Sequence, residues 1–370
     1  MKARAVPTFA RSGTLTPRSH LTGRSHSLIL RASKGGVVSA LRRRDFLGWL
    51  AAGGGLDASS FFGGRDIISE AQEKGRREGP AVLVKVLGTA QDGGIPHLGC
   101  GCPNCRRARQ DPKEARLVAA LAVADLVDRK LFLVDATPDI RPQVDAALRI
   151  FGPEPADLKG TLAGVVLTHA HIGHYTGLMF FGYESASTKG LPVYCSARMR
   201  DFLTANGPWS QLVRLENIVL RTLTAGEAVA LSERITVVPL SVPHREEFSD
   251  TLGFEVRGPR KRLLYIPDIK SWEAWDRPVA DEVGRTDVAL LDGTFFSPEE
   301  LPGRDVSAIG HPPIRESMKT LSRLSREKKA GVFFTHLNHS NPALDPAGEA
   351  RKELERAGFH LAAEGQEFFL

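Results

Sequence analysis

Short apolar runs recur along the chain from residue 82 onward, and segments with apolar positions at helical spacing lie between them. Short runs of this kind predict buried strands, and the helical spacing predicts helices that pack against them. The predicted strands are 82–87, 131–134, 165–167, 235–242, 263–266, 288–291 and 332–334. The predicted helices are 138–148, 197–203, 314–329 and 346–357, and residues 360–363 are the predicted last strand. Strands that alternate with helices indicate an α/β fold.

Most of the predicted strands end at a residue that can bind a metal or a substrate. The first strand leads into a glycine-rich loop, and the others lead to Asp135, His169, His244, Asp268, Asp292 and His336. In α/β folds, functional groups sit on loops at strand ends. We therefore expect several of these side chains to meet at one site.

The length and composition allow one large folded domain. The chain has 370 residues, of which 42% are apolar, and this is ample for a core. Residues 64–80 are polar and end in Gly-Pro, which is typical of a linker. We therefore divide the chain into a leader (1–63), a linker (64–80) and a folded domain (81–370).

The positive charge of the chain is concentrated in the leader. Residues 1–44 contain ten Lys or Arg and no Asp or Glu, so the rest of the chain carries 39 basic and 43 acidic side chains. The predicted domain has no basic stripe of the kind that binds nucleic acid. We expect a small-molecule substrate and no nucleic-acid partner.

The leader contains Arg43-Arg44-Asp45-Phe46-Leu47 before a weakly apolar stretch, which resembles a twin-arginine export signal. The resemblance predicts export in folded form to the periplasm. An organellar transit peptide is the alternative, because the segment is rich in Ser and Arg and free of acidic residues. Without such a signal the protein would be cytoplasmic. No run reaches the ~18 to 20 apolar residues of a membrane span, so we expect a soluble mature protein.

Three histidines, His169, His171 and His174, lie within six residues directly after a predicted strand. A strand that ends in a tight turn allows neighbouring imidazoles to surround one cation. The alternative is a polar loop whose histidines bond only to backbone groups. The spacing favours metal binding, because three unliganded imidazoles are costly to hold together.

This stretch resembles the His-x-His-x-Asp-His signature of the metallo-β-lactamase superfamily, with Gly173 in place of the aspartate. The resemblance implies a four-layer αββα sandwich with metals at the edge between two sheets. It assigns His169 and His171 to a first metal and leaves His174 alone for a second. We therefore expect a complete first site and a weak or absent second site.

The resemblance extends to three later strand ends. It implies that His244 is the third ligand of the first metal, that Asp268 bridges the two metals, and that His336 joins His174 at the second. Asp268 and His174 are the expected catalytic residues. Taken singly, His244 could also be a capping or surface residue, and Asp268 could be an ordinary turn residue.

Three further residues are candidates for the substrate pocket: Asp92, Asp292 and His311. Asp92 lies in the glycine-rich loop, which either approaches an anionic ligand or forms only a tight turn. Asp292 either orients a ligand histidine or starts a turn. His311 is either a pocket residue or a loop residue.

Cys100, Cys102 and Cys105 have the spacing of a structural zinc site, and His339 is the candidate fourth ligand. The alternative is a disulfide with one spare thiol, which export would favour if no metal is bound. Cys195 lies in an apolar run and is expected to be a buried small hydrophobe.

The segments 87–105, 292–295 and 338–342 together resemble the family of coenzyme PQQ synthesis protein B. The cysteine spacing with a late His-x-x-His also resembles the cyclic phosphodiesterase of the carbon-phosphorus lyase pathway. In that enzyme the structural zinc has three Cys ligands and one His ligand. The resemblance covers about residues 81–370 and does not specify the substrate.

The favoured function is metal-dependent hydrolysis, in which a metal-activated water attacks an ester, a phosphodiester or a related small molecule. Zinc is the expected cofactor at both centres, with Fe²⁺ or Mn²⁺ as alternatives at the catalytic one. One alternative function is that of an iron- and oxygen-dependent hydroxylase in PQQ-type cofactor biosynthesis. Another is a non-catalytic protein that binds or carries a quinone-like ligand. The sequence does not indicate the oligomeric state.

Overall fold

The computed structural model of the protein describes residues 80–301, 303 and 310–370. The predicted leader (1–63), with its twin-arginine motif, and all but the last residue of the predicted linker (64–80) lie outside the described residues. Among the residues that are described, no helix combines the length and the apolar composition needed to cross a bilayer.

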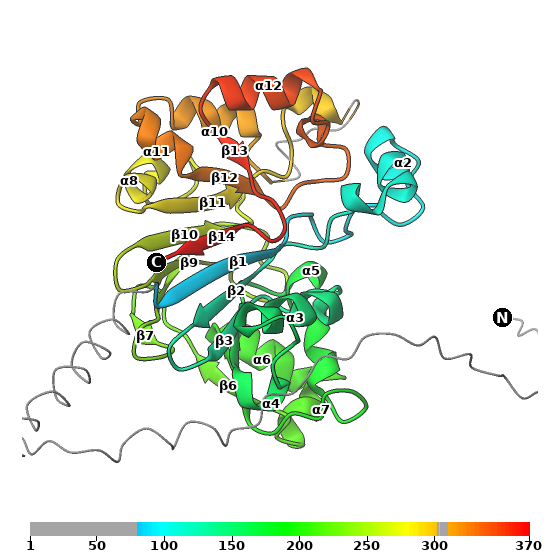
Figure 1. The fold of residues 1–370 in the computed structure, drawn as a ribbon, viewed down its shortest axis with the longest axis vertical. Coiled ribbons are helices and arrows are strands. Elements are labelled where there is room, and N and C mark those ends of the chain that lie inside the picture. The colour runs from blue at the N-terminus through cyan, green and yellow to red at the C-terminus, as the bar shows by residue number, and fades with distance from the viewer. Residues whose placement is uncertain (1–79, 302, 304–309) are drawn as a thin grey trace, which may run out of the picture. The chain divides into compact units, whose positions relative to one another are not determined.

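Two seven-stranded sheets form the framework of the described part of the chain (Figure 1). In spatial order, the first sheet contains β14 (Glu367–Phe369), β1 (Val82–Gly88), β2 (Ala120–Asp125), β3 (Lys130–Val134), β4 (Leu162–Val166), β5 (Leu191–Cys195) and β6 (Ile218–Thr222). The second sheet contains β13 (His360–Leu361), β12 (Val332–Thr335), β11 (Val288–Asp292), β10 (Arg262–Ile266), β9 (Leu252–Arg257), β8 (Thr236–Ser241) and β7 (Val229–Ala230). Each of the seven strands predicted between residues 82 and 334 corresponds to one of these.

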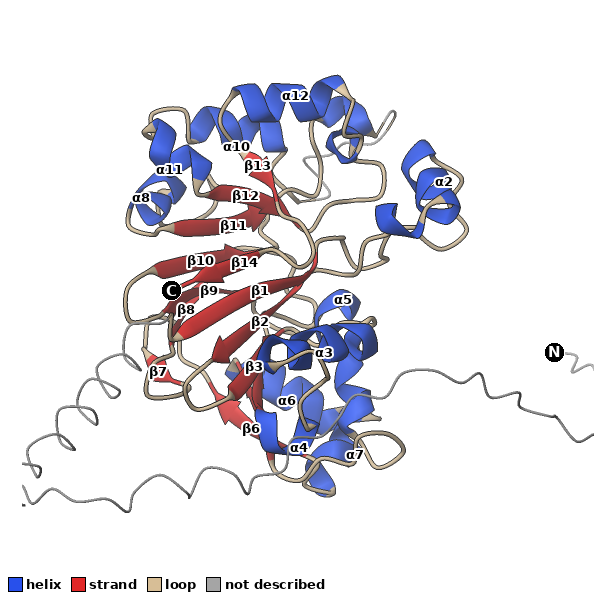
Figure 2. Cartoon of the chain, viewed as in Figure 1, coloured by secondary structure: helices blue, strands red, loops and turns tan. Residues whose placement is uncertain are grey.

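Helices cover the outer faces of both sheets (Figure 2). Those on the first sheet are α3 (Ile140–Leu148), α4 (Leu158–Thr161), α5 (Ile172–Tyr175), α6 (Ala197–Ala205) and α7 (Trp209–Arg214). Those on the second sheet are α8 (Val279–Gly284), α10 (Ile314–Thr320), α11 (Arg326–Ala330) and α12 (Glu349–Arg356). The helix α2 (Pro103–Gln110) stands beside the long loop that follows β1. Short 3-10 turns are η1 (Pro112–Glu114), η2 (Arg149–Phe151), η3 (Thr176–Phe181), η4 (Pro298–Glu300) and η5 (Pro342–Leu344).

Side chains alternate between the two faces of each sheet. In β3, Leu131 and Leu133 pack against the helices, whereas Phe132 and Val134 point into the core between the sheets. The strand β10 alternates in the same way between this shared core and the core beneath the helices of the second sheet. Successive side chains of a strand point to opposite faces, and here both faces of each sheet are covered, one by helices and one by the other sheet. The result is the four-layer αββα sandwich that the family resemblance implied.

The strands that lead to the candidate site run in the same direction within each sheet. In the first sheet β3 and β4 are parallel neighbours, and in the second β10, β11 and β12 are parallel neighbours. One antiparallel strand separates β1 from β3, and another separates β8 from β10, so β1 and β8 share these directions. The carboxyl ends of these strands therefore gather at one edge of each sheet.

Two predicted elements differ from the structure. The predicted helix 314–329 is two helices, α10 and α11, because the chain turns at 321–325 and the side chain of Ser325 caps α11 by accepting a hydrogen bond from Lys328 N. The predicted last strand, 360–363, is only the two-residue β13. The chain continues to β14, where Phe369 pairs with Leu83 of β1. The last strand therefore belongs to the first sheet.

Candidate metal centre

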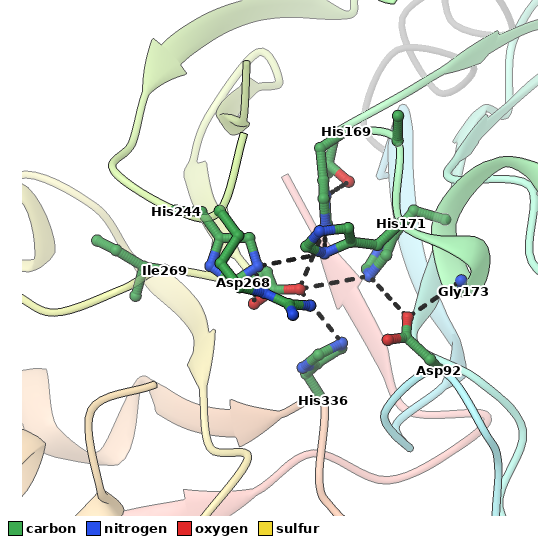
Figure 3. A network of polar contacts seen from close by, with 12 residues as sticks. Asp92, His169, His171, Gly173, His244, Asp268, Ile269 and His336 are labelled. Atoms are coloured by element: carbon green, nitrogen blue, oxygen red, sulfur yellow. Dashed lines mark hydrogen bonds and ion pairs between the residues drawn. The ribbon is translucent and has the colours of Figure 1, made fainter. Parts of the chain in front are cut away.

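Side chains that can bind metals converge from both sheets on one buried centre (Figure 3). Three sets of them have ligand atoms that all lie within 4.8 Å of one another. The sets are His169, His171, His244 and Asp268; Asp92, His174 and His336; and Asp268, His311 and His336. Every residue that the sequence placed at the catalytic centre is thus brought together there, as is each of the pocket candidates Asp92 and His311.

The first set, which we term site 1, contains His169, His171, His244 and Asp268. His171 Nδ1 lies 2.9 Å from His169 Nε2 and 3.3 Å from His244 Nε2. Asp268 completes the set, with Oδ2 3.3 Å from His169 Nε2 and Oδ1 3.1 Å from His244 Nε2. Two ligands of a tetrahedral zinc ion, each at about 2.0–2.1 Å, lie roughly 3.3 Å apart. The spacing of site 1 therefore fits such an ion.

The imidazoles of site 1 are held in their neutral form. Burial, followed by the neighbouring imidazoles, holds the pKa of His169 well below its usual value and lowers the pKa of His244 to about 2. Burial also lowers the pKa of His171. A metal binds the neutral imidazole, so a proton need not be displaced from these rings when an ion enters.

Asp268 lies between the sets. It is only 2% exposed, and its Oδ2 also lies 3.7 Å from His174 Nε2 and 3.6 Å from His336 Nε2. Burial raises the pKa of this carboxyl to about 7. A carboxylate buried so deeply is normally paired or bound to a metal. Its central position is compatible with the bridging role that the family resemblance implied.

Asp135 fixes the orientation of His174. Its Oδ2 lies 2.7 Å from His174 Nδ1, and its Oδ1 accepts hydrogen bonds from the backbone N–H and the hydroxyl of Thr168. Although burial opposes a charge on His174, the Asp135 carboxylate raises the pKa of the imidazole to about 9. Because Nδ1 is used by Asp135, the other ring nitrogen of His174 faces the centre.

The second sheet repeats this arrangement with Asp292 and Thr294. The hydroxyl of Thr294 donates to Asp292 Oδ1 at 2.8 Å, and Asp292 Oδ2 lies 2.8 Å from His311 Nδ1. Because the hydroxyl proton goes to Asp292, His336 Nδ1 at 3.0 Å is the donor to the hydroxyl oxygen. His336 therefore presents its Nε2 to the centre. Asp292 therefore contacts His311 and, through Thr294, His336, and it also accepts a hydrogen bond from Thr294 N in a tight turn. His311 is buried beside Asp268.

Asp92 reaches the centre from the glycine-rich loop that follows β1. Its Oδ1 accepts a hydrogen bond from Gly173 N at 3.0 Å and lies 3.6 Å from His174 Nε2. The loop is held by a turn in which Gly94, with a φ of +65°, donates its N–H to Gln91 O. The acidic side chain thus faces the histidines from the side of the first sheet (Figure 3).

Sequence reasoning did not assign roles to several supporting residues. Asp135 stands at a strand end, as Asp268 does, and that position was the available signal. The hydroxyls of Thr168 and Thr294 gave no signal, because threonine is common beside buried strands. Glu247, whose Oε2 lies 3.2 Å from His171 Nε2, was not recognised although it lies close to His244 in the sequence.

The three clustered cysteines and His339 form a separate set at the start of α2. His339 Nδ1 lies 3.4 Å from Cys100 Sγ and 3.6 Å from Cys102 Sγ. All four cysteines of the chain lie in the described part, and all are free thiols. Burial raises the pKa of Cys105 to about 12, so a cation is needed to stabilise its thiolate. Three sulfurs and one imidazole nitrogen match a closed structural zinc site.

Cys195 lies away from this set, at the end of β5. It is fully buried in the core beneath the helices of the first sheet. Burial raises the pKa of its thiol to about 12. The residue packs as a small hydrophobe, as predicted.

The chain is similar to known proteins over most of its length. Coenzyme PQQ synthesis protein B of Bradyrhizobium diazoefficiens is 28% identical over 312 residues, which is 78% of this chain and 99% of that protein. The same protein of Nitrosococcus oceani is 28% identical and is covered over its full length. The structure resembles that of Zn²⁺-bound PqqB from Methylobacterium extorquens, with a TM-score of 0.66 and 20% identity over 78% of this chain and 100% of that one.

A diphosphatase of the PhnP family also shares the fold, with a TM-score of 0.56 and 23% identity over 78% of this chain and 96% of that one. The sequence of residues 130–368 matches the family described as the beta-lactamase superfamily domain. This match includes β3 to β13, the first two residues of β14 and the histidine motif at residues 169–174. The chain therefore belongs to the β-lactamase superfamily and has the metallo-β-lactamase fold.

Proposed function

We propose that the protein is a metal-dependent hydrolase whose first ion is held by site 1. The observation that carries the proposal is the convergence of three neutral imidazole nitrogens and the buried Asp268 carboxylate at spacings that suit one tetrahedral ion. Zinc in such a set supplies a Lewis acid and lowers the pKa of a bound water to about 7. The superfamily match and the similarity to a Zn²⁺-bound protein support zinc as the ion.

The residues of the chain divide the remaining tasks. His169, His171 and His244 would hold the ion, and the buried carboxylate of Asp268 beside them would offset part of its charge. Thr168 and Asp135 keep His169 and His174 in fixed orientations, so little reorganisation is needed during the reaction. His311, which is held by Asp292 beside Asp268, is our candidate for contacting a substrate oxygen.

We propose an ester or a phosphate ester, most plainly a phosphodiester or diphosphate, as the substrate class. Divalent ions bound at the centre would present positive charge to a substrate there, and such a charge favours an anionic electrophile. The likeness to a diphosphatase of the PhnP family supports this choice. Small aryl esters and aryl phosphodiesters are therefore suitable first probes.

The test uses the full chain loaded with Zn²⁺ and assayed with bis(p-nitrophenyl) phosphate and p-nitrophenyl acetate. His244→Ala should remove the ion of site 1 and lower kcat/KM by more than about 100-fold, since even loss of an outer partner of a metal ligand costs about 10–100-fold. His360→Gln, a histidine in β13 outside the three sets, is the control and should keep both properties. Turnover by His244→Ala at the wild-type rate would contradict the proposal. Tight ligand binding without turnover under any metal would instead support a binding or carrier protein.

The second candidate is an iron- and oxygen-dependent hydroxylase. It is favoured by similarity that covers 99% of a coenzyme PQQ synthesis protein B, and by the set Asp268, His311 and His336, which has two histidines and one carboxylate. Anaerobic purification decides between the two candidates. Retained iron with oxygen uptake on an aromatic amino acid or peptide would favour oxidation, and retained zinc with ester hydrolysis would favour the first candidate.

A further inference from the structure

We infer that Asp92 supplies, from the loop after β1, the carboxylate that the histidine motif lacks at Gly173. With His174, His336 and Asp268 it forms a second cation site, which we term site 2. The inference rests on the proposed function, because it concerns the same metal centre. It departs from the expectation drawn from the motif alone, in which loss of the aspartate leaves the second site weak or absent.

The first support is steric. A Cβ atom added to Gly173 would lie 2.0 Å from Asp92 Oδ1, 2.9 Å from its Cγ and 2.8 Å from its Cα. Real Cβ atoms do not approach other atoms so closely. Rotation of the Asp92 side chain cannot relieve the contact with its Cα, because that atom belongs to the backbone. A side chain at 173 and Asp92 therefore exclude each other in this arrangement. Asp92 thus occupies the space that the first atom of a side chain at 173 would enter.

The second support is the state of the two histidines that Asp92 faces. His174 and His336 are both fully buried, and the Nε2 atom of each makes no hydrogen bond. The Nδ1 atom of each is fixed by Asp135 or Thr294. The unpartnered Nε2 atoms lie near the two carboxylates, that of His174 3.6 Å from Asp92 Oδ1 and that of His336 3.6 Å from Asp268 Oδ2. A buried polar atom without a partner is costly. A cation between these nitrogens and the two carboxylates removes that cost.

The third support is the way the loop is anchored. Ala90 forms a parallel bridge with Leu337, the residue that follows His336. Gln91 N donates to Leu337 O at 2.9 Å, and Leu337 N donates to Thr89 O at 2.8 Å. Asp92 is thus fixed by backbone hydrogen bonds to the same segment that carries His336. Ligands on such anchored segments are preorganised for an ion.

The polar contacts of Asp92 leave it free to bind. Its Oδ1 accepts from Gly173 N at 3.0 Å and lies 3.6 Å from His174 Nε2. A carboxylate oxygen has lone pairs for both a backbone donor and a metal. Two histidines and two carboxylates form a set that suits Zn²⁺, Mn²⁺ or Fe²⁺. The set matches in composition the one that an aspartate at 173 would have completed.

The experiment counts metals in the full chain and measures the affinity of each ion by competition with a chelator. Wild-type protein loaded with Zn²⁺ should hold three ions: one at the cysteine set, one at site 1 and one at site 2. In Asp92→Asn and in Asp92→Gly, the affinity of site 2 for Zn²⁺ should fall by about 10–100-fold or more, so that the ion is lost to the chelator. The paired change Asp92→Gly with Gly173→Asp returns a carboxylate to the position in the signature and should restore that ion. The loop after β1 has to move by a few tenths of an ångström in this variant, because Cα of residue 92 lies 2.8 Å from the added Cβ.

Asp139→Asn is the matched control. Asp139 lies near the same loop and accepts a hydrogen bond from Val118 N, but it belongs to none of the three sets. Its variant should keep three ions. Circular dichroism and retention of the cysteine-bound ion show that each variant is folded.

The inference is overturned if Asp92→Asn and Asp92→Gly keep the third ion at wild-type affinity. It is also overturned if the wild-type protein holds an ion at site 1 but none at site 2, and in that case the proposed function stands. Failure of the proposed function gives a different result, in which the wild-type protein holds an ion only at the cysteine set.

Discussion

Asp135 and Asp292 hold equivalent positions on the two sheets. Each stands at a strand end, accepts a hydrogen bond from a threonine hydroxyl, and places its other oxygen 2.7 or 2.8 Å from Nδ1 of a buried histidine. The centre is therefore supported by one such acid from each half of the sandwich. Both acids are buried and lie behind the candidate ligands, so they act by orienting them.

Replacing Asp135 should weaken metal binding without changing the candidate ligands. Asn is the suitable substitute, because Asp135 has a φ of +69° and Asn tolerates this region. Asp135→Asn removes the charge that fixes His174, so affinity for the ion at that histidine should fall by about 10–100-fold. Chelator competition measures the change. Asp128→Asn, an acid paired with Arg234, is the control, and an equal loss in both variants would refute the orienting role.

Thr294→Val tests the corresponding contact on the second sheet. The change keeps the shape of the side chain but removes the hydroxyl between Asp292 and His336. His336 then loses the partner that fixes its ring, and we expect a fall of about 10-fold or more in the affinity of the ion that it binds. Metal content at limiting zinc is the readout. Thr294→Ser, which retains the hydroxyl, should bind as the wild type does, and loss of the ion in Ser as well as Val would count against the argument.

Cys105→Ser should remove the structural ion. Zinc binds thiolates far better than hydroxyls, and a structural site contributes directly to folding stability. We expect one ion fewer per chain and a fall in Tm of about 5–10 °C. Loss of the ion should cost a few kcal/mol, and each kcal/mol lowers the Tm of a large domain by roughly 2–4 °C. Cys195→Ala is the control and should keep the full metal content. A Cys105→Ser protein with unchanged metal content would contradict the assignment.

Glu364 should make stability depend on pH. Burial raises its pKa in the folded protein to about 7 from 4.5, while its Oε1 accepts a hydrogen bond from Leu117 N. Between these two values the folded state keeps a proton that the unfolded state releases, so stability falls as pH rises from 4.5 to about 7. Glu364→Gln cannot ionise and should lose this dependence. The wild type should therefore lose up to about 3 kcal/mol of unfolding free energy relative to Glu364→Gln when the pH rises from 4 to 8.

Urea unfolding of both proteins at the two pH values measures the difference. All other titrating groups are shared, so they cancel in the comparison. The same change in stability with pH in both proteins would show that Glu364 does not carry the effect.

Much of the fold followed from local patterns. Seven strands rich in apolar residues were predicted from their continuous apolar runs, which arise because both faces of each sheet are buried. The structure brings together most of the candidate residues at their ends. The strand β2 was not predicted, since half of its sequence, Ala-Leu-Ala-Val-Ala-Asp, is alanine, which has little strand preference. The strands β5, β6 and β9 were not predicted either. The short strands β7 and β14 were missed because two or three residues carry no period.

Site residues could be predicted where they directly follow a predicted strand. His244, Asp268 and His336 could be found in this way, but the relation between Asp92 and Gly173 could not. These residues are 81 positions apart, and only the packing of the loop after β1 against α5 places one in the space left by the other. Loss of a side chain at one position and its replacement from another leave no local pattern in a single sequence.

The paired segments that carry Asp92 and His336 also carry the cysteine set, since Cys100 follows on one segment and His339 on the other, and Asn104 donates a hydrogen bond to His339 O. We therefore expect both clusters to depend on the number of residues between them. Inserting or deleting one residue between Asp92 and Cys100, or between His336 and His339, should displace the ligands of the cysteine set relative to those of the catalytic centre. An irregular loop thus joins ligands of two separate clusters, and we expect its length to matter to both.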